Sequence, residues 1–452
     1  MLYRKIRLYI DDHLSSKEDK ILLIEGARQI GKSYIIRDVG RSLYDNYVEI
    51  NFVEDDAGDK IFRNVRTTEE FYLNLSMVAG SKLDKYENTL VFIDEIQHYP
   101  QFLTMLKFLR QEHKYRFICS GSLLGITLKG TVSVPVGSII PKKMYQLDFE
   151  EFLIANDFGE DAIKHLRKSF EQKQPLPQEI HDKVLSLFKR YLLVGGMPDA
   201  VNEYLNSHNI VKVREVQEAI RELYGVDASH YEEDAAKKLY IRRIYDMIPS
   251  QMENKKKRIV AKDILDRKGD RFSNYVEEFE YLINSGITIP SHAISNPKYP
   301  LAESQQKNLL KLYLNDVGML TSQLYHYNIQ PILNDIASIN LGSVYESAVA
   351  QELKAHYEKL FYYDNKQKGE VDFLVDDSDT MSVLPIEVKS GKDYTVHSAL
   401  DNLMAIQDYH IVSSIVLSNE REIKTKGNVF YLPIYYIMFL ENKMPEKENL
   451  YF

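Results

Sequence analysis

The sequence predicts an α/β protein built from about three units: an N-terminal parallel sheet with helices on both faces, a mostly helical middle region and a C-terminal α/β unit. Three observations predict this organisation. The chain has 452 residues, which is long for a single hydrophobic core. Its first third alternates short apolar runs with segments of helical spacing, and its last quarter contains a hairpin pattern with alternating charges.

The composition excludes several classes of protein. No stretch is long and apolar enough to cross a membrane, and Met1–Lys5 lacks the apolar core of a secretory signal, so a cytoplasmic location without a membrane partner is expected. The single cysteine, Cys119, lies in an apolar run, which argues against a disulfide or a zinc site. The net charge of −9 argues against a uniformly basic nucleic-acid binder.

Two short segments stand apart from the expected folded units. Lys255–Arg258 is a basic run that would either contact phosphates or form a solvated loop, and both interpretations stay open. Residues 448–452, Glu-Asn-Leu-Tyr-Phe, match the remnant of a tobacco-etch-virus protease site from an expression tag, so they are excluded from the biology.

The first unit, residues 1–160, is expected to contain the parallel sheet. Parallel strands are buried on both faces and therefore appear as continuous apolar runs. Segments with helical spacing separate the runs, as the connections between parallel strands require. The four expected strands are residues 21–24, 47–52, 90–93 and 116–119.

The middle unit, residues 161–330, is expected to be mostly helical. Within it, Val260–Leu265 and Phe272–Ser285 have the spacing of two helices joined by a glycine-containing turn, and candidate strands follow at Ile287–Ile294 and Lys311–Leu314. Two helices followed by two strands are typical of a winged-helix module. The helical pattern already begins at about Leu147, and its clear amphipathic stretches are Phe149–Leu153, Val184–Leu193 and Lys212–Leu223.

A phosphate-binding loop follows the first expected strand. Residues Gly26–Ser33 match the pattern G-x-x-x-x-G-K-[ST], with a helix starting at Tyr34 after them. Glycines let backbone N–H groups turn toward phosphates, Lys32 would reach the β and γ phosphates, and the Ser33 hydroxyl would hold Mg²⁺. The alternative, a chance glycine loop, is disfavoured by the strand and helix in the required order. The residues expected to contact the nucleotide are Gly26, Ala27, Arg28, Gln29, Ile30, Gly31, Lys32, Ser33 and Tyr34.

An acidic pair completes the expected nucleotide site. The apolar strand Leu90–Ile93 ends in Asp94 and Glu95. Asp94 would orient Mg²⁺ through its water shell, and Glu95 would polarise the attacking water as a general base. Alone, such a pair is more often an ordinary acidic turn, but beside the loop it predicts hydrolysis of a nucleoside triphosphate. Ser120, at the end of the next strand, would sense the γ-phosphate or simply cap the strand.

With these motifs the chain resembles prokaryotic AAA-type ATPases, close to the signal-transduction ATPases with numerous domains. The resemblance covers nearly the whole chain and includes Asp94–Gln97, Gly121–Ser122, Tyr145–Leu153 and Gly195–Pro198 besides the loop. It implies ATP and Mg²⁺ as cofactors and an ATPase core followed by a helical and winged-helix region and a domain of unknown function. It leaves open whether the protein is a homo-oligomer, because many AAA-type ATPases act as rings whereas relatives of this kind stay monomeric until activated.

The resemblance also implies a role for the segment Gly195-Gly-Met-Pro198. Such a segment lies near the nucleotide, so Gly196 and Pro198 are expected to contact it and to report its state to the helical region. A glycine break between two helices is the alternative. No motif identifies an arginine finger, and Arg28, inside the loop itself, is a candidate of low specificity.

A second acidic site is expected in the C-terminal unit, residues 335–445. In one strand Glu370 and Asp372 alternate with apolar residues, and in the next strand Glu387 and Lys389 share a face. If the apolar faces pack inward, three carboxylates and a lysine converge, and a divalent cation would be their natural counter-charge. With Mg²⁺, such a cluster would activate water, and Lys389 would position the nucleophile or neutralise developing charge.

This arrangement resembles the PD-(D/E)XK, or restriction-endonuclease-like, nuclease fold. Asp372, Glu387 and Lys389 match its core residues, while Val371 stands where the name has proline. The resemblance implies that all three are catalytic and that Asp372 and Glu387 hold metal. Many members add a glutamate from the preceding helix, and Glu346 lies on the apolar stripe of such a helix, where it is a candidate further ligand. A surface hairpin with alternating charge is the alternative.

Three functions follow from these sites. In the first hypothesis, ATP turnover rearranges the middle region while the C-terminal site cleaves nucleic acid, with DNA the expected partner, using Mg²⁺. In the second, the chain is a nucleotide-operated regulatory switch or scaffold whose nuclease-like domain is catalytically inactive. The third is a metabolic kinase, for which the sequence offers no small-molecule pocket.

Overall fold

The computed structural model describes residues 2–122, 137–231, 234–254, 257–266, 269–305, 309–334, 341–391 and 393–442. Contacts within the chain divide it into two units: unit 1 comprises residues 1–145 and 284–287, and unit 2 comprises residues 146–283 and 288–452. Lys255, Lys256 and the expected tag remnant at 448–452 lie outside the described residues.

Unit 1 contains a five-stranded parallel sheet in the order β2-β3-β4-β1-β5. The four strands expected from apolar runs are confirmed within one or two residues. The fifth strand, β5, was not expected, because Pro141 and two lysines interrupt its apolar run; a proline is tolerated at the edge of a sheet. The strands are β1 Ile21–Glu25, β2 Asn46–Asn51, β3 Thr89–Asp94, β4 Arg116–Gly121 and β5 Ile139–Lys143.

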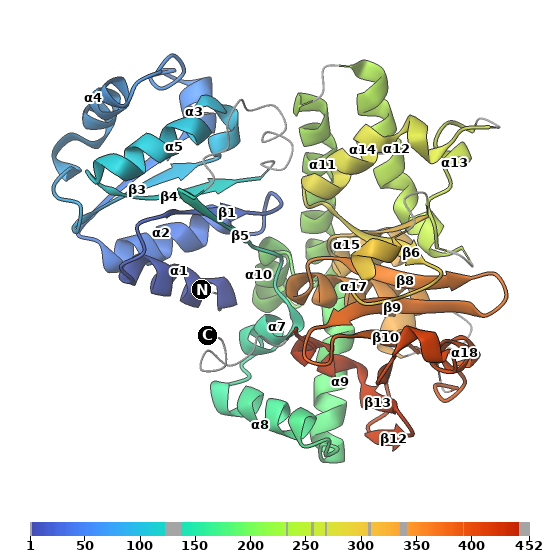
Figure 1. Cartoon of the computed structure of the whole chain (residues 1–452). Helices are drawn as coiled ribbons and strands as arrows, with labels where there is room; N and C mark the ends of the chain where they lie inside the picture. Colours follow the sequence, from blue (N-terminus) through green and yellow to red (C-terminus); the bar gives the residue numbers. More distant parts are fainter. Residues whose placement is uncertain are drawn as a thin grey trace. The chain divides into compact units, whose positions relative to one another are not determined.

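Helices cover both faces of this sheet (Figure 1). On one face α3, α4 and α5 bury an aromatic cluster in which Phe52 and Phe102 lie 4.8 Å apart between ring centroids. Each buried phenylalanine contributes roughly 2 kcal/mol of hydrophobic stabilisation, so this cluster fixes the sheet against its helices. On the other face α1 packs on α2. The helices are α1 Lys5–Ser15, α2 Lys32–Leu43, α3 Phe52–Ala57, α4 Thr68–Ala79 and α5 Gln101–Glu112, with 3-10 turns at Gly80–Lys82 and Ile96–His98.

Unit 2 begins with a helical part. All three amphipathic stretches expected here are helical, in α7, α9 and α11. Asp148 and Glu151 form a reciprocal capping box at the start of α7, and Pro198 occupies the first turn of α10, where its missing N–H has no cost. The helices of this part are α7 Phe149–Ala155, α8 Glu160–Glu171, α9 Gln178–Val194, α10 Pro198–Ser207, α11 Ile210–Tyr231, α12 Ala235–Met252, α13 Lys262–Leu265 and α14 Val276–Asn284.

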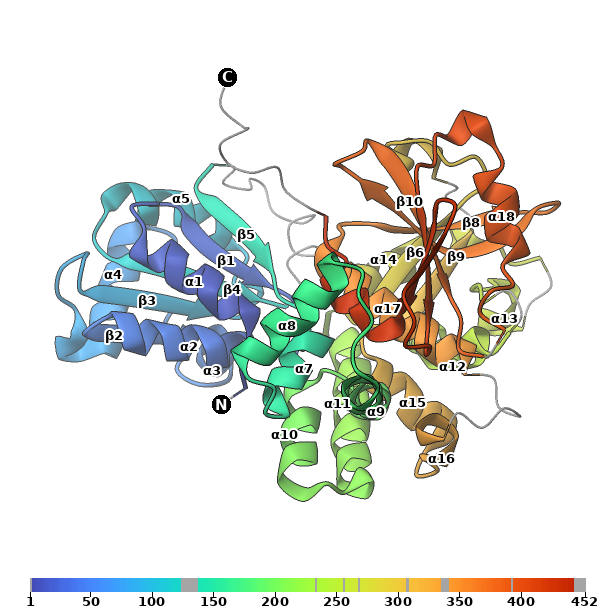
Figure 2. The same ribbon diagram turned by 90° about the horizontal axis from the view of Figure 1, so that it is seen from below.

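The rest of unit 2 is built on a mixed eight-stranded sheet in the order β12-β13-β11-β10-β9-β8-β6-β7. Helix α17 packs between α9 and this sheet, as Figure 2 shows. The strands are β6 Thr288–Ile294, β7 Leu310–Leu314, β8 Leu360–Asn365, β9 Gly369–Asp377, β10 Ser382–Val388, β11 Ser414–Ser418, β12 Lys424–Lys426 and β13 Val429–Pro433. The remaining helices are α15 Val317–Tyr325, α16 Gln330–Leu333, α17 Gly342–His356 and α18 Ser398–Met404, with 3-10 turns at Phe272–Asn274, Leu301–Ser304, Gln407–Tyr409 and Ile434–Phe439.

The two strands expected to form the wing of a winged-helix module have a different role. Both exist, as β6 and β7, and they pair with each other in antiparallel fashion. However, β6 also pairs with β8 in parallel, so the two strands extend the C-terminal sheet rather than forming a separate module. The physical reason is burial: all of β7 is buried, whereas a wing exposes its hairpin. The strands β6 and β7 therefore do not form the wing of a winged-helix module.

None of the helices in the described part of the chain combines the length and the apolarity that a bilayer crossing requires.

Candidate functional site

The phosphate-binding loop joins β1 to α2, as expected. β1 ends at Glu25 and α2 begins at Lys32. Gly26 is required by close packing, since a Cβ atom there would lie 2.4 Å from the carbonyl oxygen of Met144. The Lys32 ammonium is buried and donates to the carbonyl oxygens of Gly26, at 3.0 Å, and Ala27, at 2.8 Å. The loop is thus a compact cradle that ends at the N-terminus of a helix, where anions bind favourably.

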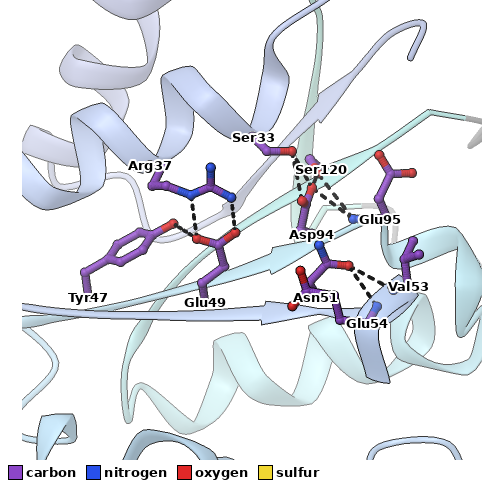
Figure 3. A network of polar contacts seen from close by, with 10 residues as sticks. All are labelled: Ser33, Arg37, Tyr47, Glu49, Asn51, Val53, Glu54, Asp94, Glu95 and Ser120. Atoms are coloured by element: carbon purple, nitrogen blue, oxygen red, sulfur yellow. Dashed lines mark hydrogen bonds and ion pairs between the residues drawn. The ribbon is translucent and has the colours of Figure 1, made fainter. Parts of the chain in front are cut away.

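The two residues expected to hold Mg²⁺ in unit 1 meet at the carboxyl ends of the strands (Figure 3). The Ser33 Oγ lies 2.8 and 2.9 Å from the two carboxylate oxygens of Asp94. Ser120, at the end of the neighbouring strand β4, donates its hydroxyl to Asp94 Oδ1. Burial, followed by repulsion from Glu95, raises the pKa of Asp94. Oxygen donors around a carboxylate with this excess negative charge fit a divalent cation.

Glu95 is held in a defined orientation beside this cluster. Its backbone is left-handed, with φ of 52°, a conformation that costs energy for a residue with a side chain and occurs often at functional sites. Gln97 Nε2 donates to Glu95 Oε2, and the Ser122 hydroxyl donates to the same oxygen at 3.0 Å. Burial alone would raise the pKa of Glu95, but the Lys32 ammonium and the Gln97 hydrogen bond together lower it. The side chain is therefore an ionised carboxylate at neutral pH, as a general base must be.

Gln97 and Ser122 hold the Glu95 side chain in place, which the sequence did not reveal. Both belong to segments that carry the family resemblance, yet nothing in their spacing showed that they contact Glu95. Gln97 Nε2 also donates to Ser122 Oγ at 3.0 Å, so the two side chains form one buried support.

A second group of polar residues lies beside the nucleotide site (Figure 3). Arg37 in α2 donates to Glu49 on β2, with Nε 2.8 Å from Oε2, and the Tyr47 hydroxyl donates to Glu49 at 3.0 Å. Asn51, paired in register with Asp94, accepts from the backbone N–H of Val53 at 2.9 Å and thereby caps α3. These contacts fix the end of β2 next to the cluster of Asp94.

The segment Gly195–Pro198 lies in unit 2. The Gly196 N–H donates to Asp316 Oδ2 at 2.6 Å, and a Cβ atom at Gly196 would lie 2.0 Å from the carbonyl oxygen of Leu147, so only glycine fits. Burial raises the pKa of Asp316 to about 6. The contact of Gly196 and Pro198 with a nucleotide stays a prediction.

The residues expected in the C-terminal acidic site converge. β9 and β10 are antiparallel neighbours, and Val371 and Phe373 are buried on the face opposite Asp372. Asp372 Oδ2 accepts from the backbone N–H of Val388 at 2.8 Å, and Lys389 Nζ lies 2.8 Å from Glu387 Oε1. Burial, then repulsion from Glu387 and Glu346, raises the pKa of Asp372 to about 8. Burial likewise raises the pKa of Glu387.

Glu346 is buried in α17, as expected, but both of its carboxylate oxygens are already engaged. Lys311 Nζ lies 3.0 Å from Oε1, Tyr313 donates its hydroxyl to the same oxygen, and Lys257 donates to Oε2. Although burial would raise the pKa of Glu346, the two lysines lower it to about 2. The expectation that Glu346 adds a metal ligand is corrected accordingly: two ammonium groups already neutralise it.

The same network extends toward solvent. Lys311 also lies 2.8 Å from Glu370, and Arg258 lies 2.6 Å from Asp364. In the described parts of the chain, no group of three or more His, Cys, Asp and Glu side chains is arranged to hold a metal ion. The sequence did not reveal the contacts of Lys257 and Lys311 with Glu346, because both lysines lie far from it along the chain.

Comparisons with known families agree with the order of units along the chain. Residues 18–153 match an AAA domain, residues 185–327 match a domain of unknown function (DUF8612), and residues 341–437 match a second domain of unknown function (DUF4143). The chain thus carries an AAA-type P-loop ATPase domain followed by two domains of unknown function. No curated protein gives a significant match.

Solved structures of similar fold include two archaeal proteins. The Walker-type ATPase PABY2304 of Pyrococcus abyssi shares 14% identity over 71% of this chain and 95% of that chain, with a TM-score of 0.42. The ORC1 protein of Aeropyrum pernix, solved in complex with DNA, shares 12% identity over 75% of this chain and 93% of that chain, with a TM-score of 0.33. At these TM-scores the likenesses support no conclusion about function.

Proposed function

We propose that unit 1 binds ATP with Mg²⁺ and hydrolyses it, and that this cycle controls a nuclease-like domain in unit 2 that binds nucleic acid. The observation that carries the proposal is the meeting of Ser33, Asp94 and Ser120 at one edge of the parallel sheet. Beside them, Lys32 has the positive charge that phosphate binding requires, and Glu95 has the ionised carboxylate that proton acceptance requires.

Each residue has a defined task in this proposal. The Ser33 hydroxyl would hold Mg²⁺, Asp94 would orient the ion through the ion's water shell, and the ion would supply positive charge to the phosphates. Lys32 exchanges its two carbonyl partners for the β and γ phosphates. Glu95, oriented by Gln97 and Ser122, accepts the proton of the attacking water.

Calorimetry and a phosphate-release assay test the proposal. We expect Mg-ATP to bind the parent chain, and Lys32→Ala to lose binding because it lacks the ammonium that meets the phosphates. Glu95→Gln should bind Mg-ATP but release phosphate far more slowly. Parent protein that is folded and gives no heat of binding with Mg-ATP would rule the proposal out.

The nuclease-like part of the proposal is supported by topology. From α17 the chain runs through three antiparallel strands, β8 to β10, then through α18 to β11, which pairs with β10 in parallel. Asp372, Glu387 and Lys389 come from adjacent strands of this arrangement, as they do in the nuclease fold that the sequence resembles.

Cleavage of nucleic acid by unit 2 is the competing candidate. It is favoured by Glu387 Oε2, a buried oxygen with no hydrogen-bond partner among the described residues. Cleavage is disfavoured by Lys257 and Lys311, which form ion pairs with Glu346 and so keep it from binding a metal ion. These lysines favour the regulatory switch, in which the domain binds without cutting.

Binding and cleavage assays with single- and double-stranded DNA and RNA separate the two candidates. For the switch we expect no cleavage with Mg²⁺ or Mn²⁺, and affinities that differ between ATP and ADP and lose that difference in Lys32→Ala. Cleavage that disappears in Asp372→Ala would instead establish the nuclease. Equal affinities for nucleic acid in the presence of ATP and of ADP would contradict the switch.

A further inference from the structure

The C-terminal cluster gathers its carboxylates from three elements of unit 2. Glu346 comes from α17, Asp372 comes from β9, and Glu387 is the second-last residue of β10. The pKa shifts of Asp372 and Glu387 include repulsion from Glu346, so the three charges act on one another. Carboxylates that repel one another are stabilised by nearby positive charge or by a proton on one of them.

The positive charge that reaches Glu346 comes from the chain itself. The Lys311 side chain is fully buried and lies between Glu346, at 3.0 Å, and Glu370, at 2.8 Å. The Lys257 side chain, 17% exposed, donates to the other oxygen of Glu346. A cation that used Glu346 would have to displace two ammonium groups and the Tyr313 hydroxyl.

The neighbouring charges are paired in the same way. Arg258 contacts Asp364 at 2.6 Å and Glu370 at 3.6 Å, and Lys389 contacts Glu387 at 2.8 Å. The carboxylates therefore meet a nearly equal number of cationic side chains. The carboxylates are Glu346, Asp364, Glu370, Asp372 and Glu387, and the cations are Lys257, Arg258, Lys311 and Lys389.

These residues do not fit a divalent cation held by all three carboxylates. Mg²⁺ takes six oxygen ligands in a nearly ideal octahedron. Of the contacts above, only Glu387 Oε2 offers a buried carboxylate oxygen without a partner among the described residues. Asp372 and Glu387 could supply only part of that set of ligands, because both oxygens of the third carboxylate, Glu346, are engaged by ammonium groups.

We infer that Lys257 and Lys311 take the place of a divalent cation in the C-terminal cluster, so that unit 2 keeps its carboxylates together without a metal ion. Both lysines precede the nuclease-like core in the chain. Lys311 belongs to β7, which joins the sheet through β6, and the backbone N–H of Ile259, close to Lys257, donates to the carbonyl oxygen of Leu310 at 3.1 Å. The middle of the chain therefore supplies the positive charges that the carboxylates of the nuclease-like core need. The inference does not depend on ATP hydrolysis by unit 1.

Mn²⁺ binding, followed by electron paramagnetic resonance without nucleotide, tests the inference. The full chain with Asp94→Asn, which removes the expected ligand in unit 1, is compared with the same chain carrying Lys257→Met. We expect no Mn²⁺ binding that depends on Asp372 in the first protein. In the second, release of Glu346 should create binding at least about tenfold tighter, and Asp372→Asn should abolish it.

Two outcomes would overturn the inference. One is Mn²⁺ bound by the Asp94→Asn chain and lost on adding Asp372→Asn, which would show a metal site that tolerates both lysines. The other is a folded Lys257→Met chain, judged by circular dichroism, that gains no Mn²⁺ binding.

Should Lys257→Met fail to fold, Lys257→Gln keeps a hydrogen-bond donor at that position. Thermal melting of the parent then gives a second readout: equal melting temperatures in Mg²⁺ and in a chelator support the inference, and stabilisation by Mg²⁺ that requires Asp372 refutes it.

Discussion

The two acidic clusters of this chain differ in how their charge is balanced. In unit 1, Asp94 accepts hydrogen bonds from the hydroxyls of Ser33 and Ser120, while the Lys32 ammonium donates to two loop carbonyls and acts on Asp94 and Glu95 through its charge. In unit 2, Glu346 receives two ammonium groups from Lys257 and Lys311. Hydroxyl hydrogen bonds leave the negative charge of Asp94 in place for a metal ion, whereas two ammonium groups in direct contact neutralise Glu346. Similar acidic patterns in a sequence can therefore have opposite requirements for metal.

The largest expected effect concerns the base of unit 1. Glu95→Gln removes the carboxylate that accepts a proton but keeps the shape of the side chain. We expect the rate of ATP turnover to fall by roughly 10²- to 10⁴-fold, the usual range for loss of a general base, with nucleotide binding retained. Phosphate release under saturating Mg-ATP measures the rate. Glu54→Gln, at an exposed carboxylate in α3, is the matched control and should leave the rate unchanged.

The second effect tests the internal counter-charge in unit 2. Lys311→Met leaves Glu346 and Glu370 facing each other without their shared cation. Loss of one partner from a buried ion pair costs about 3–5 kcal/mol, so denaturant unfolding should show a loss of that order. Adding Glu346→Gln should restore part of the lost stability, because this change removes the buried carboxylate that no longer has a cation beside it. Lys366→Met, at an exposed lysine of unit 2, is the control. Equal stability of Lys311→Met and parent would contradict the internal counter-charge.

The third effect is a gain in stability that depends on pH. Because the pKa of Asp372 is raised to about 8, the folded chain holds a proton there that the unfolded chain has released above about pH 4. Asp372 therefore lowers stability progressively as pH rises from about 4 to about 8. Asp372→Asn keeps the acceptor for Val388 and should raise the free energy of unfolding at pH 8 by at least about 1.4 kcal/mol, with little gain at pH 4. A loss of stability at pH 8 would contradict the raised pKa of Asp372.

The smallest effect concerns Ser120. Ser120→Ala removes one hydrogen bond to Asp94, worth about 1 kcal/mol, so the Mg²⁺ concentration needed for half-maximal ATP turnover should change by less than about tenfold. Ser33→Ala, which removes the hydroxyl that we propose binds the metal directly, should have a larger effect on the same titration. If Ser120→Ala impaired turnover as strongly as Ser33→Ala, Ser120 would have a direct role in holding the metal or phosphate.

The sequence predicted that Gly26–Ser33, Asp94 and Ser120 come together, because a continuous loop and the pairing of parallel strands decide this arrangement. Gly26–Ser33 is one continuous segment, and parallel strands bring Asp94 and Ser120 to the same edge of the sheet whatever the loops between them do. The alternation of Asp372 with buried residues in β9 was predicted for a similar reason, since the period of a strand is fixed by its geometry.

The sequence did not predict contacts that depend on distant pairing. The strands β6 and β7 have the spacing of a wing, and only their pairing with β8 shows that they belong to the C-terminal sheet. That pairing also brings Lys311 near Glu346, although 34 residues separate them in the chain. Gln97 and Ser122 were named in motifs, but the orientation of Glu95 toward them depends on its left-handed backbone.

The number of Mn²⁺ ions bound per chain, measured with a non-hydrolysable ATP analogue, tests the contrast between the two clusters most directly. We expect one ion per chain, lost in Asp94→Asn and retained in Asp372→Asn. Two ions per chain, one of them lost in Asp372→Asn, would contradict the conclusion that lysines take the place of a metal in unit 2.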